Sequence, residues 1–559
     1  MIRTTGKQAL IELLRREGVE YVFGIPGATE IQFMDALEQA GDMQYVLGLN
    51  EIVCAGMAEG YARASGNTGF LNLHTAPGLA AATPMLYNAM YGLVPLVITT
   101  GQNATRLLQH APHLSGDIVG LGKIFTKWST EPVHAQDLPA VIQRAFKMAR
   151  QAPAGPVLVS LPQNVLLQEL DFVDRPNTVV FPHLRPDTHA LARALELLVA
   201  AERPLVLVES GVARCDALDE VVRFAELIGA PVYQNWMSDV NFPVDHPQYL
   251  GDFDLNAPWA VQLMHHTDLL IGIGCSLFAE GFFNPDAPLL EGTKIIHIDD
   301  NPWEIGKNFP TDCGLLGDIK TTLDELNRVL EMGFAAADPA WMGLKERAAA
   351  RSARAAADKA ASRAALEAKW AAERDKTPIS VSRLMAEIRD VMTPETLIVD
   401  DCWTSSGTLR QMLGLNRARS YFRARKGGSI GWGLPGALGV QLGAPNNKVI
   451  CVSGDGSAGW SMQSLWTAAR YNIPVTYVIT NNATYGQVKM VRKAILGDYP
   501  LTEKHEGMEL DQPVMNFSLM AQSMGVEGER VSDPDQLGAA LRRAVGAQLP
   551  RLVEVMLGW

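Results

Sequence analysis

Short apolar runs bounded by Gly and Pro alternate along most of the chain with amphipathic stretches of about ten or more residues. Typical runs are "PLVITTGQ", "GPVLVSLP" and "DLLIGIGCS". Strands with such continuous apolar character are typical of parallel sheets covered by helices, because both of their faces are buried. The pattern therefore predicts an α/β fold with doubly wound parallel sheets.

The apolar runs form three blocks. The first extends to about residue 180, and the second follows the Pro-containing connection "DRPNTVVFPHLRPDT". Residues 341–376 are rich in Ala, Arg, Lys and Glu and contain no Pro, so high helix propensity predicts a helical connector. We therefore predict an N-terminal domain at 1–180, a middle domain at 181–340, the connector at 341–376 and a C-terminal domain at 377–559.

The composition limits the function classes. Hydrophobic residues make up 47% of the 559-residue chain and charged residues 19%, as in globular proteins with large cores. The formal net charge of −13 disfavours nucleic-acid binding, which needs a basic surface. No apolar run approaches the length of a membrane span, and the first residues read as an amphipathic helix rather than a signal peptide. We therefore expect a small-molecule substrate, with no nucleic-acid or membrane partner.

The cysteines are scattered, and none forms a CxxC pair. Their positions are Cys54, Cys215, Cys275, Cys313, Cys402 and Cys451. This spacing indicates neither a disulfide framework nor a zinc site. A reducing, cytoplasmic location is therefore expected.

The segment "VSGDGSAG" places Asp455 between two glycines at the end of an apolar strand. A buried carboxylate is costly unless it is paired, and a cation is the obvious candidate. The next strand, "VTYVITNN", ends in Asn481 and Asn482, and Asn482 follows Asp455 by 482 − 455 = 27 residues. Neighbouring parallel strands bring such residues to one edge of the sheet, where carboxylate and amide oxygens suit Mg²⁺ or Ca²⁺. Read alone, GDG is equally a tight turn and NN a strand terminator.

At this spacing the pair resembles the GDG…NN motif of thiamine diphosphate-dependent enzymes. The resemblance implies that Asp455, Asn482 and the carbonyl of Thr484 hold Mg²⁺, or Ca²⁺, on the cofactor diphosphate. It also implies pyrimidine-binding, middle and diphosphate-binding domains, as in the thiamine diphosphate-dependent decarboxylases. The further cofactor contacts that it implies are Thr404, Gly456, Ser457, Tyr485 and Gly486.

Two other segments match this family. "LGLNEIVCAGMAEGYARASG" offers Glu51 for the aminopyrimidine ring, although an acid in the first turn of a helix also favours the helix dipole. "RKGGSIGWGLPGALG" offers Ile430 as the apolar wedge that bends the cofactor and the Gly428 carbonyl as acceptor for its amino group. In the family, the two domains that share a cofactor come from different subunits. The resemblance therefore implies at least a homodimer, and we expect a homotetramer.

Within the family the chain most resembles the benzoylformate decarboxylases, with acetolactate synthases and benzaldehyde lyases as relatives. "GDGSAGWSMQSLWTAARYNIP", "NNATYG" and "FLNLHTAPG" carry this resemblance, and the last implies that His74 transfers protons. Two departures weaken simple decarboxylation. Ala28 stands where those enzymes have a substrate-binding serine, with Thr29 as a neighbouring substitute, and "CSLFAEGFF" lacks their second histidine.

The loop "QHAPHLSGDIVG" offers His110 and His113 as replacements, and His113 matches the family alignment better. Both histidines could equally decorate a surface loop. Gln487, which follows "ATYG", is a candidate for the substrate pocket and would suit a more polar substrate. The catalytic candidates are thus Glu51, His74 and His113.

The main hypothesis is a thiamine diphosphate- and Mg²⁺-dependent lyase that acts on a 2-oxo acid or aldehyde by decarboxylation, carboligation or both. The alternative is an acetolactate synthase-like transferase that joins two oxo compounds, with structural FAD in the middle domain. FAD is not expected under the main hypothesis. A dinucleotide-dependent dehydrogenase would need G-x-G-x-x-G opening a helix, and "IGIGCSLFAEG" holds only fragments of it.

Overall fold

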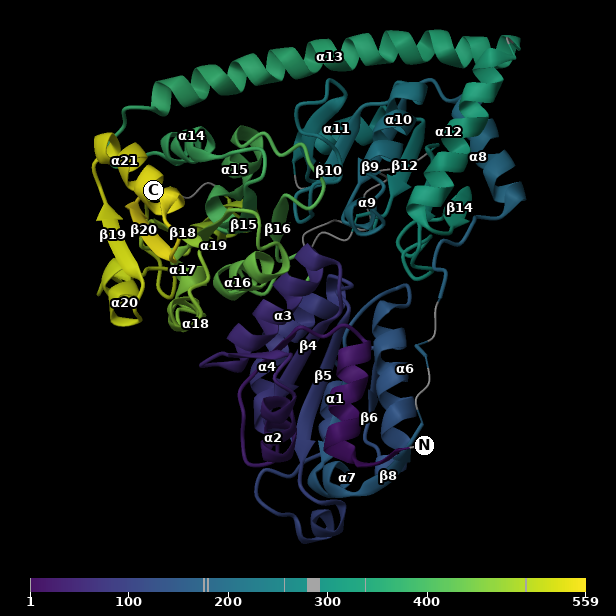
Figure 1. Ribbon diagram of the computed structural model, residues 1–559. Helices are drawn as coiled ribbons and strands as arrows, with labels where there is room; N and C mark the ends of the chain where they lie inside the picture. Colours follow the sequence, from purple (N-terminus) through teal and green to yellow (C-terminus); the bar gives the residue numbers. More distant parts are fainter. Residues whose placement is uncertain are drawn as a thin grey trace. The chain divides into compact units, whose positions relative to one another are not determined.

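The computed structural model describes residues 2–173, 176–177, 180–255, 257–278, 292–336, 338–497 and 500–558. The chain divides into two compact units. The first combines Met1–Val180, Asp375–Ser406 and Phe422–Trp559, and the second combines Phe181–Arg374 and Gly407–Tyr421. Figure 1 shows the helices and strands of both units.

The N-terminal part of the first unit contains a six-stranded parallel sheet with the order β3-β2-β4-β5-β7-β6. Its strands are β2 (Tyr21–Gly24), β3 (Gln44–Leu47), β4 (Gly69–Leu73), β5 (Leu96–Gln102), β6 (Trp128–Thr130) and β7 (Val157–Pro162). The helices of this part are α1 (Gly6–Arg16), α2 (Ile31–Ala40), α3 (Glu51–Ser65), α4 (Thr75–Tyr91), α5 (Ile118–Gly122), α6 (Leu138–Arg150) and α7 (Gln163–Leu167), with the 3-10 turns η1 (Thr105–His110) and η2 (Ala135–Asp137). A separate antiparallel ribbon pairs β1 (Ile2–Thr5) with β8 (Glu169–Phe172).

Consecutive residues of the central strand β5 pack into different cores. Val97 joins a buried cluster with Leu10 of α1 and Phe146 of α6. Ile98 joins another with Val53 of α3 and Leu86 of α4. Because successive side chains of a strand point to opposite faces, helices cover both faces of this sheet.

The C-terminal part of the first unit contains a second six-stranded sheet with the order β16-β15-β17-β18-β20-β19. Its strands are β15 (Leu397–Asp401), β16 (Tyr421–Arg423), β17 (Val449–Gly454), β18 (Thr476–Asn481), β19 (Glu527–Val531) and β20 (Arg551–Met556). The helices of this part are α14 (Val381–Val391), α15 (Ser406–Met412), α16 (Gly433–Gly443), α17 (Asp455–Ala458), α18 (Ser464–Arg470), α19 (Gly486–Leu496), α20 (Phe517–Ser523) and α21 (Pro534–Gly546), with the 3-10 turn η3 (Trp403–Ser405). The pairs β15–β17, β17–β18, β18–β20 and β19–β20 are parallel.

The two parts of the first unit meet where α3 packs against α16. The contact is close because small residues face one another: a Cβ atom built on Gly60 would lie 2.2 Å from the Gly436 carbonyl oxygen. A Cβ atom on Gly439 would lie 2.0 Å from the Met57 carbonyl oxygen. The two backbones therefore touch at positions that only glycine allows. This explains the small residues in "CAGMAEGYARAS" and "GLPGALG".

The second unit contains a third six-stranded parallel sheet, with the order β11-β10-β9-β12-β13-β14. Its strands are β9 (Pro204–Val208), β10 (Val232–Asn235), β11 (Tyr249–Phe253), β12 (Leu269–Ile273), β13 (Lys294–Asp299) and β14 (Cys313–Leu316). Its helices include α8 (Thr188–Ala200), α9 (Gly211–Arg214), α10 (Leu218–Ile228), α11 (Pro258–His265), α12 (Ile319–Ala335) and α13 (Pro339–Glu373). The Ala-rich segment of the sequence thus forms one long helix, α13.

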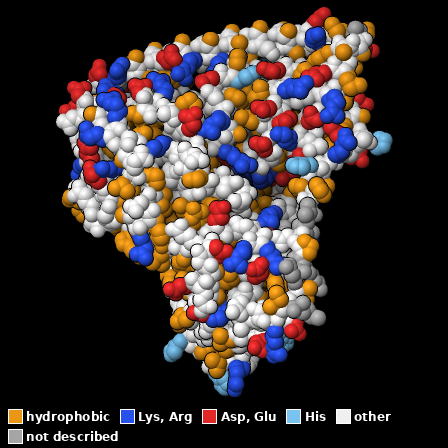
Figure 2. Space-filling model, in the orientation of Figure 1, with side chains coloured by type: hydrophobic (Ala, Val, Ile, Leu, Met, Phe, Trp, Pro, Cys, Tyr) orange, Lys and Arg blue, Asp and Glu red, His pale blue; other side chains and the backbone are white. Residues whose placement is uncertain are grey.

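The structure confirms the predicted fold class, three α/β domains that each contain a parallel sheet. The exact domain boundaries at 180, 340 and 377 stay predictions. The six cysteines all lie within the described residues, and none of them forms a disulfide bond. None of the helices that the structure describes combines the length and apolar character required to cross a membrane. On the face drawn in Figure 2, acidic and basic side chains are interspersed.

Candidate active site

The predicted metal ligands lie at the carboxyl ends of two neighbouring strands. β17 and β18 are parallel, and their register pairs Gly454 with Thr480. Asp455 follows β17 directly, and Asn482 follows β18 directly. The topology therefore brings both residues to one edge of the C-terminal sheet, as the sequence predicted.

Asp455 is a buried carboxylate with one open oxygen. Only 4% of the Asp455 surface is exposed to solvent. The Oδ1 atom accepts a hydrogen bond of 2.8 Å from the Gly456 backbone N–H. The Oδ2 atom is buried, and no residue that the structure describes forms a hydrogen bond with it. Burial raises the pKa of Asp455 to about 6, and the N–H groups of Gly456, Ala483 and Asn482 oppose this rise.

The loop after β18 is held by a second segment of the chain. The Thr484 hydroxyl and the Tyr485 N–H both donate to the Met508 carbonyl, at 2.8 Å each. The buried Lys489 ammonium forms an ion pair of 2.7 Å with the Glu509 carboxylate. Residues 508 and 509 therefore fix the backbone that carries Asn482 and Thr484.

This edge of the sheet fits a divalent cation. An unpartnered buried carboxylate oxygen, a half-buried amide and a backbone carbonyl are hard oxygen donors, as Mg²⁺ and Ca²⁺ require. A Cβ atom on Gly456 would lie 2.5 Å from the Tyr485 ring, so the glycine allows this ring to pack directly on the backbone beside Asp455. Among the described residues, no group of three or more His, Cys, Asp and Glu side chains could hold a metal. The predicted ligand set contains a single carboxylate and does not belong to that type.

The predicted wedge loop, residues 427–431, is anchored by Asp401 at the end of β15. The Asp401 Oδ2 atom accepts hydrogen bonds of 3.0 Å from the N–H groups of Gly431 and Gly433. Its Oδ1 atom accepts one of 2.9 Å from the Trp403 indole. Burial raises the pKa of Asp401 to about 7 despite these donors. Within this loop Gly428 has a φ of 65°, and Ile430 is half-buried.

Glu51 is the first residue of α3, and Asn50 caps this helix by accepting a hydrogen bond of 2.8 Å from the Ile52 N–H. Glu51 is half-buried. Its Oε1 atom lies 3.3 Å from a Cβ atom built on Gly78 in the first turn of α4. The carboxylate therefore faces the first turn of α4, the helix that follows His74.

His74 lies in a sharp turn between β4 and α4. The next residue, Thr75, is fully buried and has a φ of 53°, a left-handed conformation that is strained for a β-branched residue. The His74 Nδ1 atom lies 2.7 Å from the Glu30 carboxylate and 3.2 Å from the Thr29 hydroxyl. The turn and these contacts fix the orientation of the imidazole.

Glu30 is the buried centre of this group, with only 2% exposure. Besides His74, its carboxylate accepts hydrogen bonds from the Thr29 hydroxyl at 2.7 Å, the Gly101 N–H at 2.8 Å and the Gly27 N–H at 3.0 Å. A Cβ atom on Gly27 would collide with the His74 ring at 2.0 Å. The three residues Thr29, Glu30 and His74 therefore form one packed hydrogen-bonded group, here called the Glu30–His74 group.

The other substrate candidates are more exposed. Ala28 is exposed, and its carbonyl accepts a weak hydrogen bond of 3.4 Å from Gln163. His110 ends η1 and is exposed, as is His113, whose carbonyl accepts a hydrogen bond of 3.0 Å from Asn103. Gln487 is half-buried in the first turn of α19.

The remaining cofactor candidates surround the strand edge in the C-terminal part. Ser457 is buried in α17, Gly486 is buried at the start of α19, and Thr404 is half-buried in η3. Their roles stay predictions. The His-less segment "CSLFAEGFF" lies outside the described residues from position 279 onward.

Sequence reasoning missed Glu30 and Asp401. Glu30 ends the quoted segment "GIPGATE", but its partner His74 is 44 residues away, and only the fold joins them. Asp401 ends the apolar run "ETLIVDD" as Asp455 ends its own strand. A carboxylate at the end of a buried strand was therefore the available signal for Asp401.

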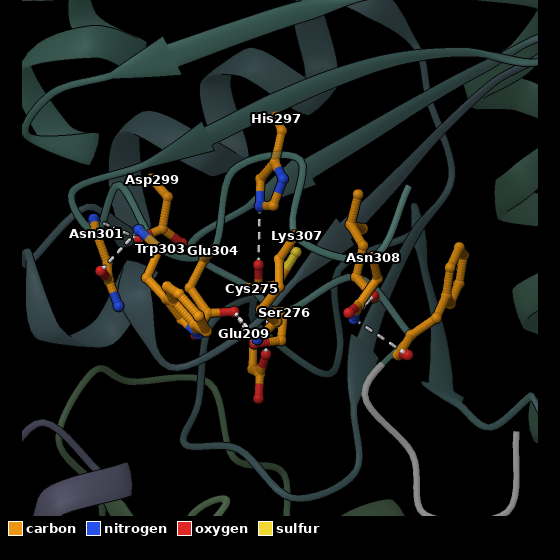
Figure 3. Close-up of polar contacts among 12 residues, drawn as sticks. Glu209, Cys275, Ser276, His297, Asp299, Asn301, Trp303, Glu304, Lys307 and Asn308 are labelled. Carbon is orange, nitrogen blue, oxygen red and sulfur yellow. Dashed lines mark hydrogen bonds and ion pairs between the residues drawn. The ribbon is translucent and has the colours of Figure 1, made fainter. Parts of the chain in front are cut away.

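The middle domain has a crevice at the carboxyl ends of β9 and β12, lined by Glu209, Cys275 and Ser276 among others. Figure 3 shows the polar contacts of these three residues and their neighbours. Glu209 follows β9, is 2% exposed, and accepts a hydrogen bond of 2.9 Å from the Ser276 N–H. Lys307 is ion-paired with Glu304 at 2.7 Å, and the Glu304 carboxylate also accepts from the Ser276 hydroxyl. Buried His297 donates from Nε2 to the Cys275 carbonyl at 2.9 Å.

These residues do not fit the diphosphate of a dinucleotide such as FAD. In parallel α/β sheets such phosphates bind to backbone N–H groups of the turns that follow the strands. Here the Glu209 carboxylate already takes the N–H of Ser276, and its negative charge would repel a phosphate. A Cβ atom on Gly211 would lie 2.4 Å from Gly274, so the two turns are also in direct contact.

Three family models match the chain. The thiamine pyrophosphate enzyme N-terminal TPP binding domain matches residues 4–121, the central domain of these enzymes matches 191–326, and their C-terminal TPP binding domain matches 404–555. Thiamine pyrophosphate is another name for thiamine diphosphate. Each of the three sheet-containing domains is matched by one model, although the strands β6, β7 and β15 lie outside the matched ranges.

Similar proteins match over nearly their whole length. Benzoylformate decarboxylase of Pseudomonas aeruginosa is 30% identical over 99% of this chain and 98% of its own. The acetolactate synthase large subunit of Haemophilus influenzae is 27% identical over 97% of this chain and 92% of its own. The structure of a thiamine diphosphate-dependent 4-hydroxybenzoylformate decarboxylase from Rhodococcus jostii is 27% identical, with a TM-score of 0.85 over 100% and 99% of the two chains.

Proposed function

Because the chain belongs to the family of thiamine diphosphate-dependent enzymes, we propose that it is a carbon–carbon lyase for a 2-oxo acid or aldehyde, working by decarboxylation, carboligation or both. The observation that carries this proposal is the open, buried oxygen of Asp455 beside Asn482, inside a domain that matches a TPP-binding model. A buried carboxylate without a partner is costly, and a cation on a diphosphate removes that cost.

In this proposal Asp455, Asn482 and the Thr484 carbonyl hold Mg²⁺ or Ca²⁺, and Gly456, Ser457, Thr404, Tyr485 and Gly486 contact the cofactor. Glu51 hydrogen-bonds to the aminopyrimidine ring, and Ile430 and the Gly428 carbonyl hold the cofactor in its bent form. When bound, thiamine diphosphate supplies a nucleophilic carbon that adds to a carbonyl group.

His74 is the proposed proton-transfer residue, and Glu30 holds it in place. A carboxylate can only accept, so the contact of 2.7 Å favours a proton on the His74 Nδ1 atom. The Nε2 atom is then the one that exchanges protons with a substrate oxygen. A positioned acid or base of this kind typically contributes about 10² to 10⁴ in rate.

The pocket favours carboligation over release of a free aldehyde. Ala28 has no hydroxyl, and the hydroxyl of Thr29 donates to Glu30, so neither is placed to grip a substrate carboxylate. Fewer groups then remain to protonate the product-forming carbon, and an added aldehyde has longer to react with it. His113 and His110 are the proposed further proton carriers, and Gln487 lines the pocket.

We further propose a homodimer at least, and a homotetramer as the working form, in the cytoplasm. The alternative, an acetolactate synthase-like transferase, is supported by the similarity to the acetolactate synthase large subunit. The crevice of the middle domain supports the lyase instead, because its residues do not fit FAD.

Product partitioning tests the proposal. The purified protein, with Mg²⁺ and thiamine diphosphate, is incubated with a panel of 2-oxo acids, with and without excess acceptor aldehyde. We expect CO₂ release, with 2-hydroxy ketone as the main product when acceptor is present. His74→Ala and His113→Ala should each lower turnover by more than about tenfold without weakening cofactor binding. Free aldehyde at every acceptor concentration would contradict carboligation. Absence of both CO₂ release and 2-hydroxy ketone formation with every substrate would contradict the lyase.

A further inference from the structure

The wedge loop is held from two sides, and one of the two holders comes from the N-terminal domain. Asp401 binds the N–H groups of Gly431 and Gly433, as described above. On the other side lies Asn88, in the last turn of α4. We infer that Asn88 is a positioning residue for the cofactor site, because its amide fixes the backbone between Gly428 and Ile430. The inference rests on the proposed function, which assigns the cofactor contacts to this loop.

Both polar atoms of the Asn88 amide bond to one residue of the loop, and Nδ2 also makes a weak contact of 4.0 Å with the Met85 sulfur. Its Oδ1 atom accepts a hydrogen bond of 2.9 Å from the Ser429 N–H. Its Nδ2 atom donates one of 3.0 Å to the Ser429 carbonyl. Asn88 is completely buried. A primary amide pairs in this way with both polar groups of one peptide residue, as a neighbouring strand would, and so restrains position as well as orientation.

The loop has no room to rearrange against Asn88. A Cβ atom on Gly427 would lie 2.4 Å from the Asn88 Cα and Oδ1 atoms, so the two backbones approach as closely as glycine allows. A second contact ties the same two segments together, since Arg425 donates a hydrogen bond of 2.5 Å to the Gly92 carbonyl at the end of α4. The loop therefore sits directly on the last turn of α4.

The hydrogen bonds between Asn88 and Ser429 matter for the cofactor because of where Ser429 lies in the loop. Ser429 lies between Gly428, whose carbonyl is proposed to bind the cofactor amino group, and Ile430, which is proposed to hold the cofactor in its bent form. Without the amide, two partly buried backbone groups of Ser429 lose their partners, and the loop must move to regain them. Displacements near 1 Å at a reacting centre cost about a hundredfold in rate.

The first test measures the loop itself, in protein without cofactor. Hydrogen–deuterium exchange of the backbone amides of residues 427–433 is compared between the unmodified protein, Asn88→Leu and the control Asn327→Leu. Asn327 is also buried, and its amide donates at 2.9 Å to the Glu220 carbonyl in the middle domain. We expect exchange in the loop to rise at least about tenfold in Asn88→Leu only. Equal exchange in all three proteins would overturn the inference.

Asn88→Asp keeps the inference testable if the leucine variant does not fold. A protonated carboxyl can accept from the Ser429 N–H and donate to the Ser429 carbonyl, as the amide does, whereas the carboxylate cannot donate. Burial shifts such a carboxyl toward its neutral form. We therefore expect near-normal loop protection at low pH and faster exchange as the pH rises. A pH-independent difference from the unmodified protein, after correction for intrinsic exchange, would contradict the two-bond role.

The last test adds the cofactor. Exchange of the C2 proton of bound thiamine diphosphate should slow about tenfold or more in Asn88→Leu, while the cofactor Kd stays within about threefold, because the diphosphate anchor is elsewhere. Asn327→Leu should change neither. If the unmodified protein binds no thiamine diphosphate, the proposed function fails, and the loop exchange of the cofactor-free protein still decides whether Asn88 holds the loop.

Discussion

Asp401 and Asp455 are both buried at strand ends of the C-terminal sheet, but their carboxylates have different partners. Asp401 accepts hydrogen bonds from two backbone N–H groups and one indole, whereas Asp455 accepts one backbone bond and leaves Oδ2 open. Burial raises both pKa values, to about 7 for Asp401 and about 6 for Asp455. The Asp401 carboxylate is therefore satisfied by groups of the protein, whereas the open oxygen of Asp455 is the one that we propose to bind a cation.

This difference predicts that Asp455→Asn stabilises the cofactor-free protein. The pKa of Asp455 rises from 3.8 to about 6 on folding, so the folded state binds more protons, and its stability falls as the pH increases between these values. The amide removes this cost of up to about 3 kcal/mol. At pH 8 the melting temperature of the cofactor-free protein should rise by about 3 °C or more, measured by thermal unfolding.

The gain from Asp455→Asn should shrink as the pH falls from 6 toward 4 and vanish below that, where the carboxyl is protonated in both states. The same variant should lose most of the stabilisation that Mg²⁺ and thiamine diphosphate give the unmodified protein. Asp390→Asn, at an exposed surface acid of the same unit, is the control. A variant that keeps this ligand-induced stabilisation would remove Asp455 from the proposed metal site.

For Glu30 we predict that a substitution changes turnover and leaves cofactor binding unchanged. Glu30→Gln replaces the carboxylate that orients His74 by a group with a competing donor, so turnover should fall about ten- to a hundredfold with an unchanged cofactor Kd. Steady-state kinetics and a cofactor titration measure the two quantities. Glu17→Gln removes a partly buried acid that pairs with Arg150 at 2.7 Å and should leave turnover within about twofold. Equal turnover in both variants would deny Glu30 its role.

At the scale of residues, a site residue could be predicted from the sequence when its neighbours along the chain indicate its role, and not when its partner is distant in the sequence. Asp455 could be predicted because its strand, its glycines and the next strand end all lie within a short stretch. Glu30 and Asn88 could not, because their partners His74 and Ser429 are 44 and 341 residues away. The role of such a carboxylate or amide depends on its hydrogen-bond partner, and only the tertiary structure shows which residue that is.

At the scale of elements, the close contact between α3 and α16 predicts that one added methyl group lowers the stability of the protein. In Gly60→Ala the new Cβ atom would lie 2.2 Å from the Gly436 carbonyl oxygen, so the helices must separate. We expect a loss of about 1–3 kcal/mol or more, seen as a lower melting temperature. Gly546→Ala at the end of α21, where nothing lies within 4 Å, should be neutral or slightly stabilising. Equal melting temperatures of the two variants would contradict the close packing.

The strands and helices themselves were largely predictable. Apolar runs such as those of β5 and β17 are buried on both faces. Their continuous hydrophobicity therefore predicts strands of a sheet that is covered on both sides. The packing of α3 on α16 was not predictable, because small residues permit close approach without specifying which helix approaches. The Ala-rich segment predicted a helix, and α13 is that helix.

The end of β9 predicts that the middle domain binds no flavin. Glu209 occupies the Ser276 N–H that a phosphate would need, and its charge opposes a second anion. Titration of the purified protein with FAD, followed by flavin fluorescence, should show no saturable binding, and the protein should be colourless after purification. A yellow protein with stoichiometric flavin would contradict this prediction and favour the synthase-like alternative.

At the scale of the whole molecule, the proposed sharing of each site between two chains has a sharp consequence. Glu51 lies in the N-terminal part of the chain and Asp455 in the C-terminal part, and the proposal assigns them to different sites of a dimer. Glu51→Gln and Asp455→Ala should each abolish turnover in a pure preparation. A mixed dimer, however, holds one site with both defects and one site with neither.

Mixing the two inactive variants therefore restores activity if the sites are shared. After equilibration of equal amounts, half of the dimers are mixed and each has one intact site, so about a quarter of the unmodified turnover should return. The measurement is CO₂ release over time after mixing, and the rise should follow the rate of subunit exchange. Mixing either variant with a double variant that carries both substitutions should restore nothing, since no intact site can form. If the two single variants also restore nothing under conditions where tagged chains exchange, each site is built within one chain, and the assignment of Glu51 and Asp455 to different sites is wrong.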